Sequence, residues 1–143
     1  MGKPKLKVQF RIPPYCTPRY VWRRQIHGAA AQALRDAAIT YGDEDELELD
    51  FRIYLKPPML RIHDVDNRLK DVMDALQGRV GGTRQKRGAL PALIPNDRQI
   101  CRVVVEKEAP PTHGQGFGQV TLRSHVAMQR YRKRRAAAVK PQG

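Results

Sequence analysis

The stretch Leu47-Glu48-Leu49-Asp50-Phe51-Arg52-Ile53-Tyr54-Leu55 places an apolar side chain at every second position. A period of two is typical of a β-strand that buries one face and exposes the other. Pro57-Pro58 follows, and proline cannot continue the hydrogen bonding of a strand inside a sheet. The sequence therefore predicts a strand over residues 47–55.

The chain before this strand predicts a second strand and a helix. Residues 6–12 alternate in the same way. Apolar residues then recur three and four apart over residues 21–41, which favours a helix that Gly42 is placed to cap. Trp22 and Tyr41 lie on the apolar face of this helix, so we expect both in the core rather than on a base-stacking surface.

The chain after this strand predicts one more helix and two more strands. Residues 100–105 form an apolar, β-branched run consistent with a buried strand, and alternation predicts a last strand over residues 120–126. The fold class is therefore α/β, as a mixed α+β layer ordered β-α-β-α-β-β in one small domain. The helix of about three turns ends at Gly78 and is indicated by apolar residues spaced as on one helix face: Leu69, Val72, Met73 and Leu76.

The charge balance is strongly basic, because 27 Lys and Arg stand against 14 Asp and Glu, a formal net charge of +13 over 143 residues. Such a chain attracts polyanions, and its binding to DNA should weaken steeply with salt. No apolar run approaches the roughly 18 residues of a membrane-spanning helix, and no apolar signal segment follows Met1. Cys16 and Cys101 form no CxxC pattern, which argues against a zinc knuckle or a disulfide framework and favours the cytoplasm.

A compact acidic stretch, HDVDNRLKDVMD over residues 63–74, interrupts this basic chain. Asp64 and Asp66 are two residues apart, so in an extended segment both carboxylates project to one side and can share a hard cation such as Mg²⁺. Lys70 lies four residues beyond Asp66, which places its ammonium one helical turn along, next to a metal-bound phosphate. Asp97, just before the next strand, is a third acidic position that can swing toward the first pair.

Ordinary structural roles compete with this chemistry. Asp66 or Asn67 is a candidate N-cap of the helix. Lys70 is also placed to form surface ion pairs with Asp66 or Asp74, each worth only about 0.3 to 0.5 kcal/mol. Spacing alone leaves the two interpretations open, because D-x-D patterns are common.

Other polar groups nearby are not expected in the site. Asp71 is expected to be solvated, and the acidic run at residues 43–46 fits a solvated turn after a helix. His63 is the weaker metal candidate, because the other candidate ligands are hard oxygens.

One longer pattern is far more specific than D-x-D: Asp64-x-Asp66-Asn67-x-x-Lys70, then Asp74-Ala75-Leu76, then Asn96-Asp97-x-Gln99-Ile100. It resembles the RusA family of Holliday junction resolvases, over most of the chain. The resemblance implies a metal-dependent, structure-selective endonuclease of DNA recombination and repair that cuts four-way junctions by paired symmetric nicks. It implies an intimate homodimer with Mg²⁺ or Mn²⁺, in the cytoplasm of a bacterial or phage-infected host cell.

Carried onto this sequence, the resemblance implies that the catalytic residues are Asp64, Asp66, Lys70 and Asp97. The metal ligands would be the three aspartates of this set. Supporting positions would be Asn67, Asp74 and Asn96. Family members often carry a second acid where Asn96 stands, and asparagine offers an oxygen without a charge.

The gap between Leu76 and Asp97 looks longer than is usual in the family, and residues 79–93 form a basic loop within it. We expect this loop to contact DNA or a partner subunit. The chain then divides into an endonuclease domain over residues 1–128 and a basic C-terminal tail over residues 129–143. Expected DNA contacts come from the acidic stretch, the loop and the tail: Arg68, Arg84, Lys86, Arg87, Arg130, Arg132, Lys133, Arg134 and Arg135.

Two other functions stay open on the sequence. The first is a less selective nuclease for flaps, forks or other branched DNA, in a phage or prophage setting. The second is a non-catalytic basic module that binds nucleic acid and uses its carboxylates only as caps and ion pairs. The first needs divalent metal for turnover, whereas the second binds without it.

Overall fold

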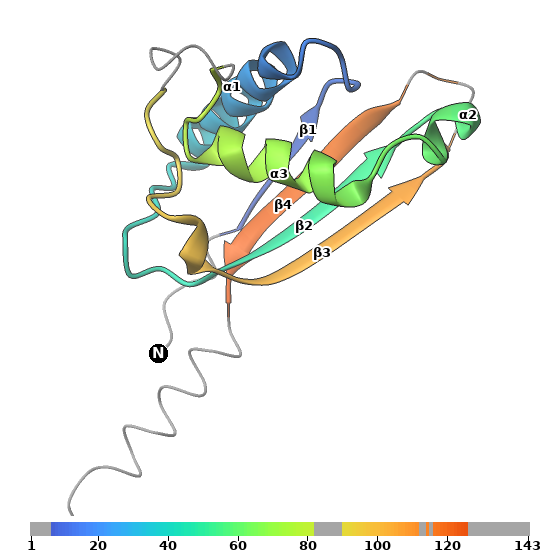
Figure 1. The fold of residues 1–143 in the computed structure, drawn as a ribbon. Helices are drawn as coiled ribbons and strands as arrows, with labels where there is room; N and C mark the ends of the chain where they lie inside the picture. The colour runs from blue at the N-terminus through green and yellow to red at the C-terminus, as the bar shows by residue number, and fades with distance from the viewer. Residues whose placement is uncertain (1–6, 82–89, 112–113, 115, 126–143) are drawn as a thin grey trace, which may run out of the picture.

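The predicted strand over residues 47–55 is a central strand of a mixed sheet in the computed structural model, which describes residues 7–81, 90–111, 114 and 116–125. This strand, β2 (Leu47–Tyr54), pairs antiparallel with β4 (Phe117–Ser124) and parallel with β3 (Ile100–Glu108). β4 pairs in turn with β1 (Val8–Ile12), so that the four strands are ordered β1-β4-β2-β3 (Figure 1).

The helices cover one face of this sheet (Figure 1). α1 (Arg19–Ala37) lies beside α3 (Val65–Leu76), and the short α2 (Pro57–Leu60) follows the end of β2. A single turn of 3₁₀ helix, η1 (Asp97–Gln99), leads into β3. The chain is thus a small single-domain α+β protein, and the order β-α-β-α-β-β expected from the sequence is confirmed apart from the two short helices α2 and η1.

The core forms where the alternating faces of the strands meet the apolar faces of α1 and α3. Leu47, Leu49, Phe51 and Ile53 are each buried to within 1 % exposure, as the period of two predicts. The helices contribute buried side chains to the same cluster: Trp22, Ile26, Ala30, Leu34, Val72, Ala75 and Leu76. Trp22 is fully buried and donates its indole N–H to the carbonyl oxygen of Pro13 at 3.0 Å, which confirms its place in the core.

Several element boundaries differ from the expectation by a few residues. α1 ends at Ala37, because Ala38 adopts a left-handed conformation with φ of 54° and closes the helix ahead of Gly42. Tyr41, just outside the helix, is nevertheless buried at 4 % exposure, as expected. β4 begins at Phe117, and Val126 lies outside the described residues.

β3 is not the buried strand that its apolar composition indicated. In the described part of the chain it has β2 on one side and no strand on the other, and Val103 is 39 % exposed. A strand with one neighbour keeps its outer side chains near solvent, which an apolar run cannot reveal.

A buried carboxylate joins the two main helices. Asp71 of α3 is fully buried, which contradicts the expectation that it is solvated. Its Oδ1 accepts from Arg19 Nη2 at 2.9 Å and from Arg23 Nε at 3.0 Å, both on α1, and its Oδ2 lies 3.5 Å from Arg68 Nε. We call these four residues the Asp71 cluster. A carboxylate loses its hydration when it is buried, and here cations from two helices replace that hydration.

Arg68 extends the Asp71 cluster toward the start of α1. Its guanidinium lies over the Tyr15 ring at 3.9 Å, and Tyr15 meets Trp22 edge to face with ring centroids 5.1 Å apart. Arg68 is only 6 % exposed, so in this structure its side chain is engaged inside the protein and is not presented to phosphate. The cluster and its aromatic neighbours therefore fix the position of α3 on α1.

Of the described helices, none is long and apolar enough to cross a membrane.

We predict that Asp71→Asn, which keeps the size of the side chain and removes its charge, destabilises the protein by about 3 kcal/mol. The reason is that it leaves three arginines around a buried site without their anion. Asp74→Asn is the matched control on the same helix, because Asp74 forms no ion pair within the described residues, and we expect it to cost less than about 1 kcal/mol. Urea unfolding followed by circular dichroism measures both. Equal losses from the two substitutions would contradict a central role for the cluster.

Candidate functional site

The two aspartates of the D-x-D pattern lie at the beginning of α3. Asp64 is the N-cap residue, with an extended backbone, but its side chain makes no capping hydrogen bond. Asp66 lies in the first turn, and both side chains are exposed. The interpretation that Asp66 or Asn67 is the N-cap is therefore wrong. The positive end of the helix dipole favours carboxylates at these positions without consuming their oxygens.

Lys70 and Asp74 follow on the same helix, at one-turn intervals after Asp66. Lys70 is exposed and Asp74 is half-buried. Among the described residues, no ion pair joins Asp66, Lys70 or Asp74 to one another or to any other group, so the surface-pair interpretation is not borne out. Asp64, Asp66 and Lys70, which we call the α3 polar row, present two carboxylates and an ammonium that the described part of the fold does not use.

Asp97 and its neighbours form a separate unit before β3. The side chain of Asn96 accepts from Arg98 N at 2.9 Å, and the side-chain oxygen of Gln99 accepts from Asn96 N at 2.9 Å. This reciprocal capping box explains an amide at position 96 without any role at a metal. Asp97, between these residues, is exposed.

Gln99 has a structural role that the sequence did not indicate. It is 6 % exposed, and its amide N–H groups donate to the backbone carbonyls of Gly42 at 2.6 Å and Asp45 at 2.8 Å. The glutamine of the later motif thus ties η1 to the turn before β2. The sequence indicated only that Gln99 lies two residues after Asp97. Its hydrogen-bond partners, Gly42 and Asp45, lie more than fifty residues away along the chain, so no local pattern could reveal them.

The structure does not bring Asp97 to the D-x-D pair within one chain. Asp64 and Asp66 follow the end of β2, whereas Asp97 precedes the start of the parallel strand β3. α3 lies between them and runs back along the sheet (Figure 1), and its 12 residues span about 18 Å. In the described ranges, no group of three or more His, Cys, Asp or Glu residues is placed to hold a metal ion.

Lys107 of β3 stabilises the turn before Asp64. Its ammonium donates hydrogen bonds to the backbone carbonyl of His63 at 3.0 Å and to that of Leu60. No motif predicted this role, which depends on β3 ending beside the turn. Lys107 therefore helps to fix the backbone that carries the α3 polar row.

His63 packs inside this turn and is not presented as a ligand. Its ring meets Tyr15 edge to face with centroids 4.8 Å apart, and its Nδ1 lies 3.4 Å from Arg68 Nη1. Burial lowers the pKa of His63 below its usual value of 6.5, and the positive charges of Arg68 and Lys107 lower it further. The imidazole is therefore neutral at pH 7.

The described ends of the long basic loop are firmly anchored. Leu93 N donates to Leu76 O at 2.8 Å, and Leu90 N donates to Gly78 O at 2.8 Å. Gly78 has φ of 79°, and a Cβ there would collide with the carbonyl of Leu90, so only glycine fits. The basic residues expected to touch DNA from this loop and from the tail lie outside the described residues: Arg84, Lys86, Arg87, Arg130, Arg132, Lys133, Arg134 and Arg135.

Comparison with known proteins adds no family assignment, because no protein-family model matches this chain and no curated protein matches it.

We predict that stability falls as the pH is lowered from 7.5 to 5.5. Because the pKa of His63 is lower in the folded state, the unfolded chain binds more protons below about pH 6.5, which favours unfolding. His63→Phe keeps a ring against Tyr15 but cannot titrate, so its urea midpoint should fall less over the same range. Parallel pH profiles for the two proteins would show that His63 does not contribute.

Proposed function

We propose that this protein is a metal-dependent, structure-selective DNA endonuclease of the RusA type, which resolves four-way junctions by paired nicks in recombination and repair. The observation that supports this most is the α3 polar row: two exposed carboxylates and an exposed ammonium without an ion-pair partner among the described residues. It lies on a chain whose net charge of +13 attracts nucleic acid.

Asp64 and Asp66 suit a hard divalent cation, because both are exposed carboxylates and neither is consumed by a cap or an ion pair in the described part of the chain. They would hold Mg²⁺ or Mn²⁺, which when bound polarises the phosphoryl group and supplies hydroxide at neutral pH. Lys70, one turn from Asp66, would place a positive charge beside the phosphoryl oxygens, where negative charge grows in the transition state. The neutral His63 adds no competing cation beside this pair.

Asp97 could contribute to the proposed metal site only from a second copy of the chain, because α3 separates it from Asp64 and Asp66 within one copy. A homodimer also suits the proposed reaction. Two opposing strands are most simply nicked in a coordinated way by two copies of one site related by symmetry.

The unpaired acids favour an enzyme over a non-catalytic binding module. Carboxylates next to phosphate repel it, so a protein that only binds DNA gains nothing from exposed aspartates at the start of α3. A less selective nuclease for flaps or forks shares the same chemistry. A panel of branched substrates at one fixed salt concentration separates that function from junction resolution.

We predict that Asp66→Asn lowers the rate of junction cleavage in Mg²⁺ by at least about 100-fold while junction affinity stays equal or rises. It removes a metal ligand and a charge that repels phosphate. Asp36→Asn, at an exposed aspartate of α1, is the matched control and should cut at the rate of the wild type. The measurement is single-turnover cleavage of a labelled four-way junction, with affinity taken from gel shifts in Ca²⁺. Undiminished cutting by Asp66→Asn would exclude the α3 polar row as the active site.

We also predict that charge reversal at Arg84, Lys86 and Arg87 weakens junction binding. If the loop contacts phosphates, the slope of log affinity against log salt should become shallower by about 0.9 for each phosphate that the variant no longer neutralises. Titrations at several salt concentrations measure this. Unchanged affinity and an unchanged slope would leave the loop without a DNA role.

A further inference from the structure

β3 offers a long free edge. It has nine residues, pairs with β2 along one side, and has no strand along its other side among the residues that the structure describes. A strand edge of this length carries a row of main-chain donors and acceptors that can pair with another strand. Every position of β3 is exposed or half-buried.

The direction of the main-chain groups follows from one hydrogen bond. Glu108 O accepts from Leu55 N at 2.9 Å, so the peptide groups of Glu108 face β2. Because these groups alternate along a strand, those of Val103, Val105 and Lys107 face outward. The register with β2 is regular from Arg102 to Glu108, so the alternation holds over this part.

The sequence of β3 is complementary to itself in one antiparallel register. With Val104 on the two-fold axis, Arg102 of one copy lies opposite Glu106 of the other, and Val103 lies opposite Val105. Opposite charges and apolar pairs are the favourable cross-strand neighbours in a sheet. A shift by two residues that places Val104 opposite Arg102 loses every Arg–Glu pair. A shift the other way pairs Arg102 with Glu108 but sets Val104 opposite Glu106 and Val103 opposite Lys107. The register about Val104 is the one that keeps the Arg102–Glu106 and Val103–Val105 pairs together.

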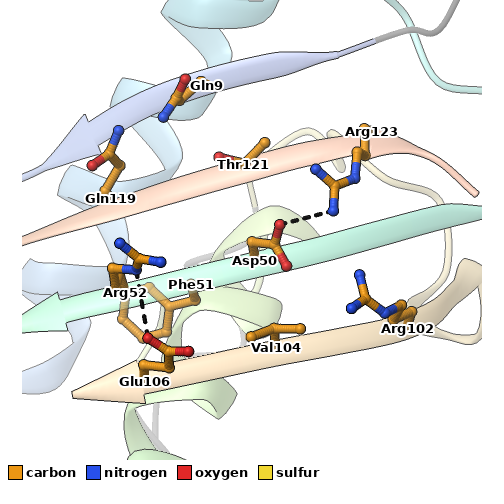
Figure 2. Close-up of a pocket in the computed structure, with 10 residues that line it drawn as sticks. All are labelled: Gln9, Asp50, Phe51, Arg52, Arg102, Val104, Glu106, Gln119, Thr121 and Arg123. Carbon is orange, nitrogen blue, oxygen red and sulfur yellow. Dashed lines mark ion pairs between the residues drawn. The ribbon is translucent and has the colours of Figure 1, made fainter.

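The charged side chains are available for this pairing. Figure 2 shows Arg102, Val104 and Glu106 in a row along β3, on the sheet face opposite the helices. Arg102 lies 3.5 Å from Glu48, Glu106 lies 3.6 Å from Arg52, and these side chains of β3 are 51 % and 48 % exposed. Such long, solvated contacts stabilise little, so they compete weakly with pairs across an interface.

We propose that two copies of this chain join through antiparallel pairing of their β3 strands about Val104, which makes one continuous sheet across the dimer. The inference specifies the interface of the homodimer in the proposed function and rests on that dimer. Its basis is the unpaired edge together with the charge complementarity of Arg102 and Glu106. A strand edge is narrower than a standard interface, so the dimer should dissociate on dilution.

The test is a charge swap read by sedimentation equilibrium on the full chain. Arg102→Glu and Glu106→Arg should each weaken dimerisation by about tenfold, because each sets like charges opposite one another twice across the axis. The double variant should restore wild-type dimerisation. Arg11→Glu, at an exposed position of β1 on the opposite edge of the sheet, is the matched control and should dimerise as the wild type does.

The outcomes separate the interface from the rest of the proposed function. A wild type that dimerises while both single variants dimerise equally well overturns the β3 interface, as does a double variant that remains dissociated while its circular dichroism shows a folded protein. A wild type that stays monomeric at every concentration overturns the dimer itself. Because the readout is mass, failure of the nuclease proposal alone would not alter these results.

Discussion

The burial of Asp71 is the constraint on which the position of α3, the helix that carries the candidate site, depends. Its carboxylate binds arginines from α1 and lies against Arg68 of its own helix, and Arg68 stacks on Tyr15. A buried charge is tolerated only where its partners are held in place, so the Asp71 cluster restrains how α3 lies against α1. Lys107 adds a second restraint at the turn before Asp64.

This constraint divides the charged residues of α3 by helix face. Arg68, Asp71, Val72, Ala75 and Leu76 form the buried stripe. Asp64, Asp66 and Lys70 fall outside it and stay exposed. The acidic stretch therefore combines one structural carboxylate with the groups proposed to bind metal and phosphate.

The strands and helices were largely predictable from the sequence, because apolar periodicity is a local property. The role of Asp71 was not, since its partners Arg19 and Arg23 lie about fifty positions away along the chain, at separations of 52 and 48 residues. The spacing of a polar residue relative to the buried positions of its own helix does not show whether an ion-pair partner lies elsewhere in the chain. The place of β3 was hidden for a related reason, because an apolar β-branched run suits an edge strand as well as a buried one.

The candidate site residues also fall into those placed by local spacing and those placed by the topology of the fold. The spacing of Asp64, Asp66 and Lys70 is local, and Lys70 lies on a helix as expected. Asp66, however, lies in the first turn of α3 and not in the extended segment expected for the two aspartates, because the helix already begins at Val65. Whether Asp97 lies close to Asp64 and Asp66 depends on the topology of the sheet. Because β2 and β3 are parallel, Asp97 lies at the far end of α3 from these two aspartates. The edge of β3 that has no strand beside it in the described part of the chain offers a route to a second copy. Pairing of two such strands in opposite directions would place the start of each β3 beside the end of the other.

The activity proposed for the α3 polar row is the cutting of branched DNA with the help of a divalent metal. The most direct measurement is incubation of the wild-type protein with a four-way junction labelled on each strand in turn, with Mg²⁺ or with a chelator. We predict symmetric nicks in two opposing strands when Mg²⁺ is present and none with the chelator. Tight junction binding that is indifferent to metal and leaves every strand intact would contradict this prediction.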